Sequence, residues 1–323
     1  MSDLPKNAPA GCLWGIFRHV LIAVVVLCGL LLLLTLIFML GVGKFVGDPT
    51  GDKLGEKIIA AGDATERVAL ITLNGVIDGW GNDAVGDGVA HTLAKKLRAA
   101  AEDATVKVVL LEVDSPGGGL TASDGLHHEI LRLKEAGKTV VAAVGDMAAS
   151  GGYYVIAPAD FIFAQPTGLI GSFGVIMEHF ELGELLKKIG VKVEPIKSAD
   201  NKDIGSIFRE MTPAEKARLG KIVGAYHQRF VEIIADGRKL PPEKVAELAT
   251  GEVFTAAEAV EYGLADRLGY HDDALTYAVN LAGKDPQVFA YEDAFSWQRL
   301  AEALSGKTAL GDFLAAGPKL WLK

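Results

Sequence analysis

The chain has 323 residues, half of them hydrophobic, and carries a net charge of −9 at pH 7. This length is enough for one large domain or two small ones. The acidic balance argues against nucleic acid as a partner, because proteins that bind nucleic acid are usually basic. The two cysteines, Cys12 and Cys28, both precede the globular part, so the sequence predicts neither a disulfide nor a Cys-ligated metal site there.

An uncharged apolar stretch, VLIAVVVLCGLLLLLTLIFML, covers residues 20–40 and follows an N-terminal tail of residues 1–19. About 20 apolar residues in a helix cross the hydrocarbon core of a bilayer, so the stretch predicts a transmembrane anchor. A cleaved signal peptide is the alternative, although its apolar region is usually only about 7–15 residues long. Two basic residues precede the stretch and three follow it, which does not set its orientation.

Residues 41–65 are rich in glycine and mixed in charge, which is typical of a linker. After them, apolar runs alternate with segments of helical periodicity. We expect strands at residues 67–77, 106–115, 139–146, 161–165 and 169–176, and helices at residues 88–102 and 121–136. This alternation predicts an α/β fold with layered parallel sheets and right-handed crossovers.

The sequence becomes mainly helical after Thr212. Residues 212–239 begin with Thr-Pro, have Glu215 three residues later, and place apolar residues at helical spacing. Further helices are expected at residues 241–249 and 255–269, the last of them closed by Gly263. The segment from about Ala290 onward indicates no function.

Three motifs of small residues follow predicted strands: SPGGG at residues 115–119, AASGG at 148–152 and GSFG at 171–174. Loops at the carboxyl ends of parallel strands line the usual ligand crevice of an α/β fold. Glycines there let backbone amides approach a ligand, and two amides aimed at one point form an oxyanion hole. Tight packing of strand against helix is the alternative explanation, because it also favours glycine and alanine.

Ser150 lies at a strand-to-helix turn, as the nucleophile of a hydrolase would, although the GxSxG motif is absent. A nucleophilic serine needs a base. The adjacent histidines His127 and His128 would face different ways on a helix, and we interpret them as surface residues. A lysine can serve when burial lowers its pKa, but the pattern alone does not choose among four candidates, namely Lys187, Lys188, Lys197 and Lys202.

Two long stretches, GDMAASGGYYVIAPADFIF and GSFGVIMEHFELGELLKKIGVKVEPIKSADNKDIGS, resemble the signal peptide peptidase A (SppA) family of serine–lysine membrane peptidases. SPGGG and FTAAEAVEYGLADRLGY resemble other stretches of the same family. The resemblance runs from about Val68 to about Leu281, and the single apolar span matches the short members of the family. The linker and the last forty or so residues are not covered.

The resemblance implies a Clp protease/crotonase-like fold and a peptidase domain at residues 66–285, followed by a C-terminal tail at residues 286–323. It implies Ser150 as the nucleophile and Lys202, rather than Lys197, as the general base. Gly118 matches the oxyanion position and Ser172 the position that hydrogen-bonds the lysine amine. Gly151, the residue after the nucleophile, is expected to supply the second oxyanion amide. No metal or cofactor is implied.

The resemblance also implies a homo-oligomer in which neighbouring protomers contribute serine and lysine to shared sites. Its substrates would be cleaved signal peptides that remain in the membrane lipid. The catalytic domain would be extracytoplasmic, on a single-pass protein of the cell (inner) membrane. Two alternatives stay open: a crotonase-type acyl-CoA hydratase or isomerase, and a catalytically silent membrane scaffold of the same fold. The first would need neither the Ser150–Lys202 pair nor a membrane span.

Overall fold

The computed structural model of this chain describes residues 19, 21–22, 24–33, 54–79, 82–83, 86–293 and 321–322. These residues fall into two compact units: one holds the described residues before Leu54 together with Asp293, and the other contains Leu54–Glu292 and the strand at residues 321–322. The two units are described separately.

The first unit holds part of the predicted anchor. Residues 21–22 and 24–33 are helical and exposed, whereas residues 20, 23 and 34–40 of the expected span lie outside the described residues. Within the part of the chain that the structure describes, no helix has the length and apolar character needed to cross a bilayer. The transmembrane anchor at residues 20–40 therefore remains a prediction.

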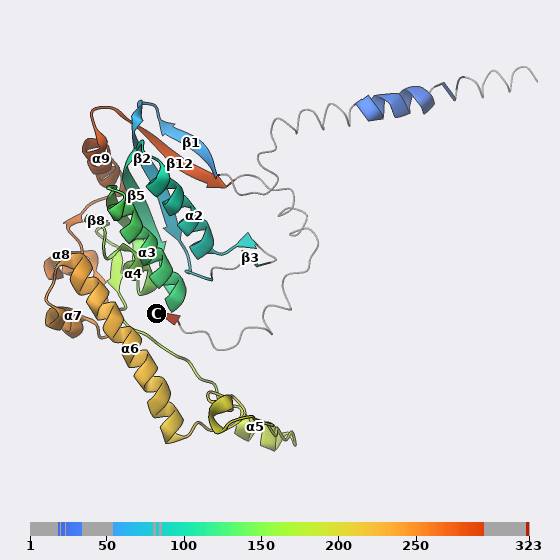
Figure 1. The fold of residues 1–323 in the computed structure, drawn as a ribbon, viewed down its shortest axis with the longest axis vertical. Helices are drawn as coiled ribbons and strands as arrows, with labels where there is room; N and C mark the ends of the chain where they lie inside the picture. Colours follow the sequence, from blue (N-terminus) through green and yellow to red (C-terminus); the bar gives the residue numbers. More distant parts are fainter. Residues whose placement is uncertain are drawn as a thin grey trace, which may run out of the picture. The chain divides into compact units, whose positions relative to one another are not determined.

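The second unit is built on a largely parallel sheet (Figure 1). The strands follow the order β1-β12-β2-β5-β7-β8-β11, with β9 and β10 branching from β7. Their bounds are β1 (Leu54–Ala60), β2 (Asp63–Asn74), β5 (Val106–Ser115), β7 (Thr139–Ala149), β8 (Phe161–Ala164), β9 (Leu169–Gly171), β10 (Val253–Thr255), β11 (Arg267–Leu268) and β12 (Pro286–Asp293).

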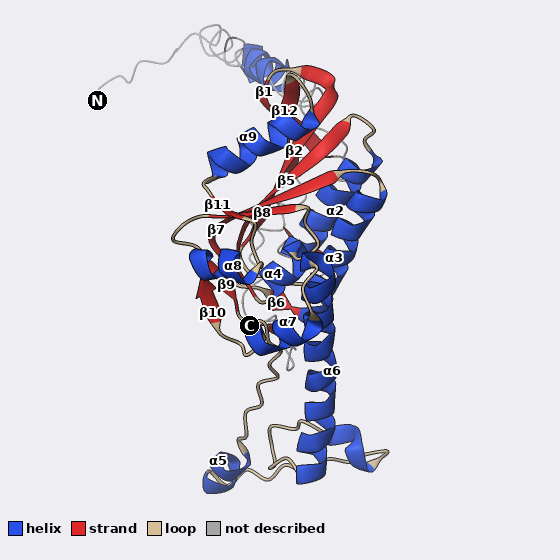
Figure 2. Ribbon diagram, turned by 90° about the vertical axis from the view of Figure 1, so that its left-hand side faces the viewer, coloured by secondary structure: helices blue, strands red, loops and turns tan. Residues whose placement is uncertain are grey.

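Helices cover both faces of this sheet, as the two ribbon views show (Figures 1 and 2). On one face lie α2 (Val89–Glu102), α3 (Leu120–Glu135) and α4 (Gly151–Ile156). Their apolar sides bury a large core against β2, β5 and β7. A smaller core lies on the other face, where α9 (His271–Ala282) packs its alanines against the same strands. The predicted α/β fold with a parallel sheet is confirmed.

The helical part after Thr212 is also confirmed. It consists of α6 (Pro213–Arg238), α7 (Pro242–Leu248) and α8 (Ala256–Tyr262). Thr212 and Glu215 form the predicted capping box at the start of α6, and Gly263 ends α8 in a left-handed conformation. Each of these ends satisfies backbone groups that a helix leaves unpaired.

The sheet is larger at both ends than the sequence predicts. Strand β1 and the start of β2 lie inside residues 41–65, which we expected to form a linker, and β12 lies inside the expected tail of residues 286–323. The sequence of β1, LGEKIIA, lacks the alternation of apolar and polar residues that signals a strand, and most of the strand is exposed. Strand β12 pairs in parallel with β2, and its residues Val288 and Phe289 are buried. The folded unit therefore extends beyond residues 66–285.

Two further expectations are wrong. The strand expected at residues 169–176 ends at Gly171, because Ser172 has a positive φ of 55° that breaks the extended backbone. His127 is not a surface residue: it is 8% exposed and packs edge-on against the ring of Tyr154. Its neighbour His128 is exposed, as expected.

A long arm follows β9. It contains α5 (Gly183–Lys188) and the 3-10 turn η1 (Asp200–Asp203), and both ribbon views place α5 near the end of α6 that is farther from the sheet (Figures 1 and 2). The arm exposes large apolar side chains, including Phe180, Leu185, Ile189 and Ile196. We call residues 176–208 the arm below.

Candidate active site

Ser150 lies between β7 and α4, at the point where the chain turns from strand to helix. Strand β7 pairs with β8 through residues 141–144 and with β9 through residues 147–149. This change of partner extends β7 to Ala149, directly before the serine. The sequence therefore folds here into a strand, a one-residue turn and a helix.

The backbone of Ser150 is strained and its side chain is enclosed. Its torsions are φ 51° and ψ −119°, a region that non-glycine residues rarely adopt. Its amide donates to the carbonyl oxygen of Gly171 at 2.8 Å, and its own carbonyl accepts from Tyr154 N at 2.9 Å. The residue is 0% exposed, and its hydroxyl has no hydrogen-bond partner in the described structure. An enclosed hydroxyl without a partner is destabilising, so a functional explanation is called for.

The SPGGG loop packs directly on this turn. A methyl group on Gly117 would lie 2.6 Å from the Gly151 amide nitrogen and 2.9 Å from Ser150 Cβ. A methyl group on Gly151 would lie 3.2 Å from the Gly118 amide nitrogen and 2.4 Å from Ser123 Oγ. No side chain fits between the two segments. The structure therefore brings three predicted residues, Ser150, Gly151 and Gly118, into one site.

The N–H and C=O of Gly118 point away from Ile77. Ile77 N donates to the Gly117 carbonyl at 2.8 Å, and Gly119 N donates to the Ile77 carbonyl at 2.8 Å. Peptide groups alternate in direction along an extended chain, so the N–H and C=O of Gly118 point to the opposite edge. There β6 (Gly118–Gly119) pairs antiparallel with β13 (Trp321–Leu322), with Leu322 opposite Gly118. This edge accepts an extended peptide backbone.

Ser172 begins next to the same turn. The carbonyl of Gly171, the residue before it, accepts the hydrogen bond from Ser150 N. Ser172 is partly buried, and its amide donates to the Glu252 carbonyl at 2.6 Å. The structure thus places the Ser172 backbone beside the elbow that carries Ser150.

Lys202 lies in a different element from Ser150 and the SPGGG loop. It belongs to η1 in the arm, is exposed, and its amide donates to the Ala199 carbonyl at 3.1 Å. Ser150 belongs to the start of α4, within the core, and its hydroxyl contacts no lysine. Among the residues that the structure describes, the turn at Ser150 therefore holds an enclosed serine hydroxyl and nearby glycine amides, and Lys202 makes no hydrogen bond to that hydroxyl.

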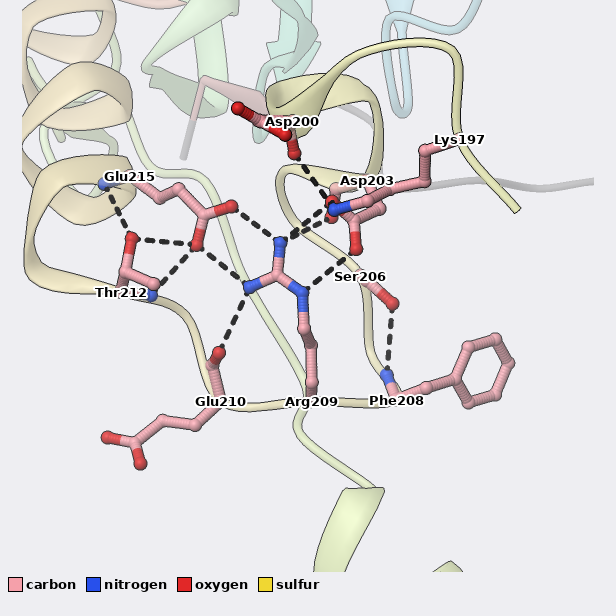
Figure 3. Close-up of polar contacts among 9 residues, drawn as sticks. All are labelled: Lys197, Asp200, Asp203, Ser206, Phe208, Arg209, Glu210, Thr212 and Glu215. Carbon is pink, nitrogen blue, oxygen red and sulfur yellow. Dashed lines mark hydrogen bonds and ion pairs between the residues drawn. The ribbon is translucent and has the colours of Figure 1, made fainter. Parts of the chain in front are cut away.

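Sequence reasoning missed the polar cluster that surrounds η1. Arg209 bridges Asp203 in η1 and Glu215 in α6, and Lys197 also binds Asp203 (Figure 3). Arg209 lies in the loop between η1 and α6, outside any helix or strand, so no periodic pattern in the sequence points to it.

Comparison with known proteins identifies the family. The profile of peptidase family S49 matches residues 132–285. A protein of Enterococcus faecium named "Putative signal peptide peptidase SppA" is 34% identical over 272 residues, which cover 79% of this chain and 78% of that protein. Protease 4 of Salmonella typhi is 36% identical over 220 residues, which cover 68% of this chain and 35% of that protein.

A plant relative shows the same similarity. The chloroplastic serine protease SPPA of Arabidopsis thaliana is 34% identical over 241 residues, which cover 74% of this chain and 34% of that protein. This chain thus spans about a third of the Salmonella and Arabidopsis relatives. Among solved structures, a ClpP1 mutant of Listeria monocytogenes has a TM-score of 0.42 and 18% identity, over 64% of this chain and 94% of that one.

The family match and the similar protease sequences favour the peptidase interpretation over the acyl-CoA enzyme and the silent scaffold. The matched residues 132–285 include the strained serine, its glycine neighbours and the η1 turn. The chain belongs to peptidase family S49, the SppA family, and is a serine peptidase.

Proposed function

We propose that this peptidase cleaves peptides with Ser150 as its nucleophile and Lys202 as its general base. One observation carries the proposal: Ser150 presents an enclosed hydroxyl without a partner, on a strained turn, against the amide-bearing Gly117–Gly118 loop. A base and a substrate carbonyl would provide the partners that this hydroxyl lacks.

The reaction follows from these groups. The neutral amine of Lys202 accepts the Ser150 proton while Oγ attacks the peptide carbonyl. The amides of Gly118 and Gly151 hold the resulting oxyanion, and loss of one such donor typically costs about 3 kcal/mol of transition-state stabilisation. Lys202 then protonates the departing amine, and water hydrolyses the ester on Ser150. Ser172 is proposed to hydrogen-bond and orient the lysine amine.

The base is proposed to come from a neighbouring copy of the chain. Lys202 lies on the arm, whose exposed side chains include Phe180 at 70% and Ile196 at 103% exposure. A patch of large apolar side chains on a surface is typical of a protein interface. Docking of the arm on a neighbour would bury this patch and bring Lys202 to a second Ser150. It would also remove water from the amine, which favours its neutral form.

Extended apolar peptides are the proposed substrates, and remnants of cleaved signal peptides in the membrane are the proposed natural source. The pairing of Leu322 and Trp321 with β6 supports this, because an apolar segment in strand conformation lies along the Gly118 edge. Strand pairing recognises backbone and leaves side chains to adjoining pockets.

The proposed setting is the cell inner membrane. Residues 20–40 would anchor the chain by a single pass, and the catalytic unit would be extracytoplasmic. The uncharged length of this stretch supports an anchor.

Hydrolysis of a fluorogenic apolar peptide by the full chain in detergent tests the proposal. Ser150→Ala and Lys202→Ala should each reduce kcat by about 10⁴-fold or more. Lys188→Ala is the control, because Lys188 is an exposed arm lysine to which we assign no role. Substantial activity in either of the first two variants, with the fold intact, would exclude the Ser150–Lys202 mechanism.

A further inference from the structure

The η1 turn that carries Lys202 has almost no apolar support. It consists of four residues, none of them buried. A short 3-10 turn without a packed side chain does not hold a long lysine in one place. Other contacts must fix the geometry of the turn if Lys202 is to act as a base, and Figure 3 shows a dense group of charged side chains around its last residue, Asp203. We call Lys197, Asp203, Arg209 and Glu215 the Arg209 cluster.

Arg209 forms hydrogen bonds to Asp203, the residue directly after Lys202. Its Nε donates to Asp203 Oδ2 at 3.0 Å, and its Nη2 donates to Asp203 Oδ1 at 3.0 Å. Nη2 also lies 3.2 Å from the Asp203 carbonyl oxygen, as donor. The guanidinium therefore holds both the side chain and the backbone of Asp203. A planar two-point contact of this kind fixes direction as well as distance.

The guanidinium of Arg209 also forms an ion pair with Glu215 in α6. Nη1 donates to Glu215 Oε2 at 2.9 Å and Nη2 donates to Glu215 Oε1 at 2.6 Å. Glu215 is itself fixed, because its Oε2 accepts from Thr212 N at 2.8 Å within the capping box. Helix α6 has 26 residues and buries Phe230 and Ile234 in the core. Arg209 thus connects the Lys202 turn to a long helix that is anchored in the folded unit.

A second cation closes the other side of the turn. Lys197 Nζ donates to Asp203 Oδ1 at 2.8 Å and to the Asp200 carbonyl at 3.0 Å. Asp200 and Asp203 are the first and last residues of η1, so this lysine spans the turn. Lys197 is engaged in holding η1, which separates its role from that of Lys202.

We propose that Arg209 is a positioning residue, which holds the η1 turn against α6 so that Lys202 is presented in one geometry. The inference rests on the proposed function, since it assigns Arg209 a role only if Lys202 is the base. Arg209 touches neither Ser150 nor the β6 edge, so its loss should lower kcat and leave KM little changed.

The cluster has an electrostatic consequence as well. Hydrogen bonds from Arg209 and then from Lys197 hold the pKa of Asp203 below its usual value, so this carboxylate is charged. The charged groups around η1 are Lys197, Asp200, Asp203, Arg209 and Glu215. Without Arg209, Glu215 and the carboxylate of Asp203, which follows Lys202 directly in the sequence, lose their main counter-charge. Uncompensated negative charge stabilises a protonated amine, so the base should lose its proton at higher pH.

The test compares the full chain in detergent with Arg209→Met, Arg209→Lys and the Asp203→Asn/Arg209→Met pair. Arg218→Met is the matched control, because Arg218 is an exposed arginine on α6. Size-exclusion chromatography and thermal unfolding check assembly and fold, and peptide hydrolysis gives kcat, KM and the pH profile of kcat/KM.

We expect Arg209→Met to lower kcat by about 10- to 100-fold with KM changed less than about threefold. The rising limb of its pH profile should move to higher pH. Addition of Asp203→Asn to Arg209→Met should reverse part of that shift, because it removes one of the uncompensated negative charges. The kcat of Arg209→Lys should lie between those of the wild type and Arg209→Met, because an ammonium group keeps the charge but cannot bind both carboxylates in fork geometry. If Arg209→Met does not fold or assemble, the same measurements on Arg209→Lys decide.

If the Arg209 variants keep the wild-type kcat and pH profile while Lys202→Ala is inactive, the role proposed for Arg209 is wrong and the proposed function still stands. Activity in Lys202→Ala would instead overturn the assignment of the base, and with it the proposed function. If kcat falls and the pH profile does not change, the loss of activity reflects only a structural role of Arg209, and the proposed effect on Lys202 is wrong.

Discussion

Two serines with left-handed backbone torsions lie at the ends of neighbouring strands. Ser150, Ser172 and Lys239 are the non-glycine residues with positive φ in the described chain. Each such residue costs about 1–3 kcal/mol, so strain of this kind is retained where surrounding contacts enforce it. The hydrogen bond from Ser150 N to the Gly171 carbonyl couples the two turns. Two of these three residues are therefore the proposed nucleophile and the serine proposed to orient the base.

The contact between Gly151 and Ser123 gives a prediction on this turn. In Gly151→Ala the new methyl group would lie 2.4 Å from Ser123 Oγ and 3.2 Å from Gly118 N. We expect a loss of about 1–3 kcal/mol in unfolding free energy and at least about 10²-fold in kcat. Adding Ser123→Ala should restore stability more than activity, because the methyl group still crowds the Gly118 amide.

The control for this experiment is Gly145→Ala, also in the segment that leads to Ser150. Its methyl group would meet only the Val113 carbonyl, at an ordinary 3.7 Å. Urea unfolding and peptide hydrolysis measure the two quantities. Equal losses in Gly145→Ala and Gly151→Ala would contradict the proposed close contact.

His127 gives a pH-dependent prediction. Burial, the largest cause, lowers its pKa from 6.5 to about 4, despite the nearby charge of Asp124. Between these values the unfolded chain binds a proton that the folded chain does not, so unfolding free energy falls as pH drops from about 6.5 to about 4. His127→Gln should weaken this dependence by about 1–3 kcal/mol between pH 7 and pH 4.5.

Urea unfolding at the two pH values measures the effect. His128→Gln is the natural control, because His128 is the exposed neighbour on the same helix. A pH dependence unchanged by His127→Gln, or one equally reduced by His128→Gln, would show that His127 does not carry it.

At the scale of elements, strands with apolar runs could be predicted and strands with polar ones could not. Strands β5 and β7 are almost continuously buried, and their sequences have no other reasonable interpretation. Strand β1 is an exposed edge, and its sequence resembles a linker. Strand β12 pairs with β2 across more than 200 residues of sequence, a contact that no local pattern encodes.

The site divides in the same way. The turn at Ser150 and the SPGGG loop could be predicted, because runs of small residues after strands indicate either a ligand-binding loop or tight packing of strand against helix. The choice of Lys202 rested on family resemblance, since four lysines fitted the pattern equally well. The Arg209 cluster joins a loop to a helix through side-chain geometry, and geometry of that kind leaves no periodic trace in a sequence.

Strand β13 leads to a prediction at the same scale. It pairs with the β6 edge on which we expect substrate to bind, so the two should compete. Deletion of residues 320–323 should lower KM for a peptide substrate by about 2- to 10-fold, since a few backbone hydrogen bonds are worth about 1 kcal/mol net. The turnover rate, kcat, should not change.

Deletion of Lys323 alone is the control, because it leaves Trp321 and Leu322 in place. Steady-state hydrolysis over a range of peptide concentrations separates KM from kcat. A KM that is the same in the full chain and in both deletions would mean that β13 does not compete with substrate.

For the whole molecule, the central question is how an exposed lysine on an arm reaches an enclosed serine in the core. The arm exposes Phe180, Leu185 and Ile196, and a chain that kept these side chains in water would be prone to associate. The proposed association of copies would answer both problems, because it would cover the apolar arm and supply the base. Ile196→Asp should therefore reduce the oligomer and the activity together, as size-exclusion chromatography and peptide hydrolysis would measure.

Complementation tests whether the base comes from a neighbour. Ser150→Ala and Lys202→Ala chains should each be inactive alone, yet regain activity when co-assembled. A site needs an intact serine from one chain and an intact lysine from the next, so random mixing in equal amounts restores about a quarter of the sites in a closed ring.

The matched control co-assembles Ser150→Ala with the Ser150→Ala/Lys202→Ala chain, in which no intact serine remains. It should stay inactive at every ratio, which excludes contamination as the source of activity. If the two single variants form mixed oligomers and hydrolysis still does not return, Lys202 must act on the Ser150 of its own chain. The arm would then have to fold back onto the core, and Ile196→Asp would leave an active monomer.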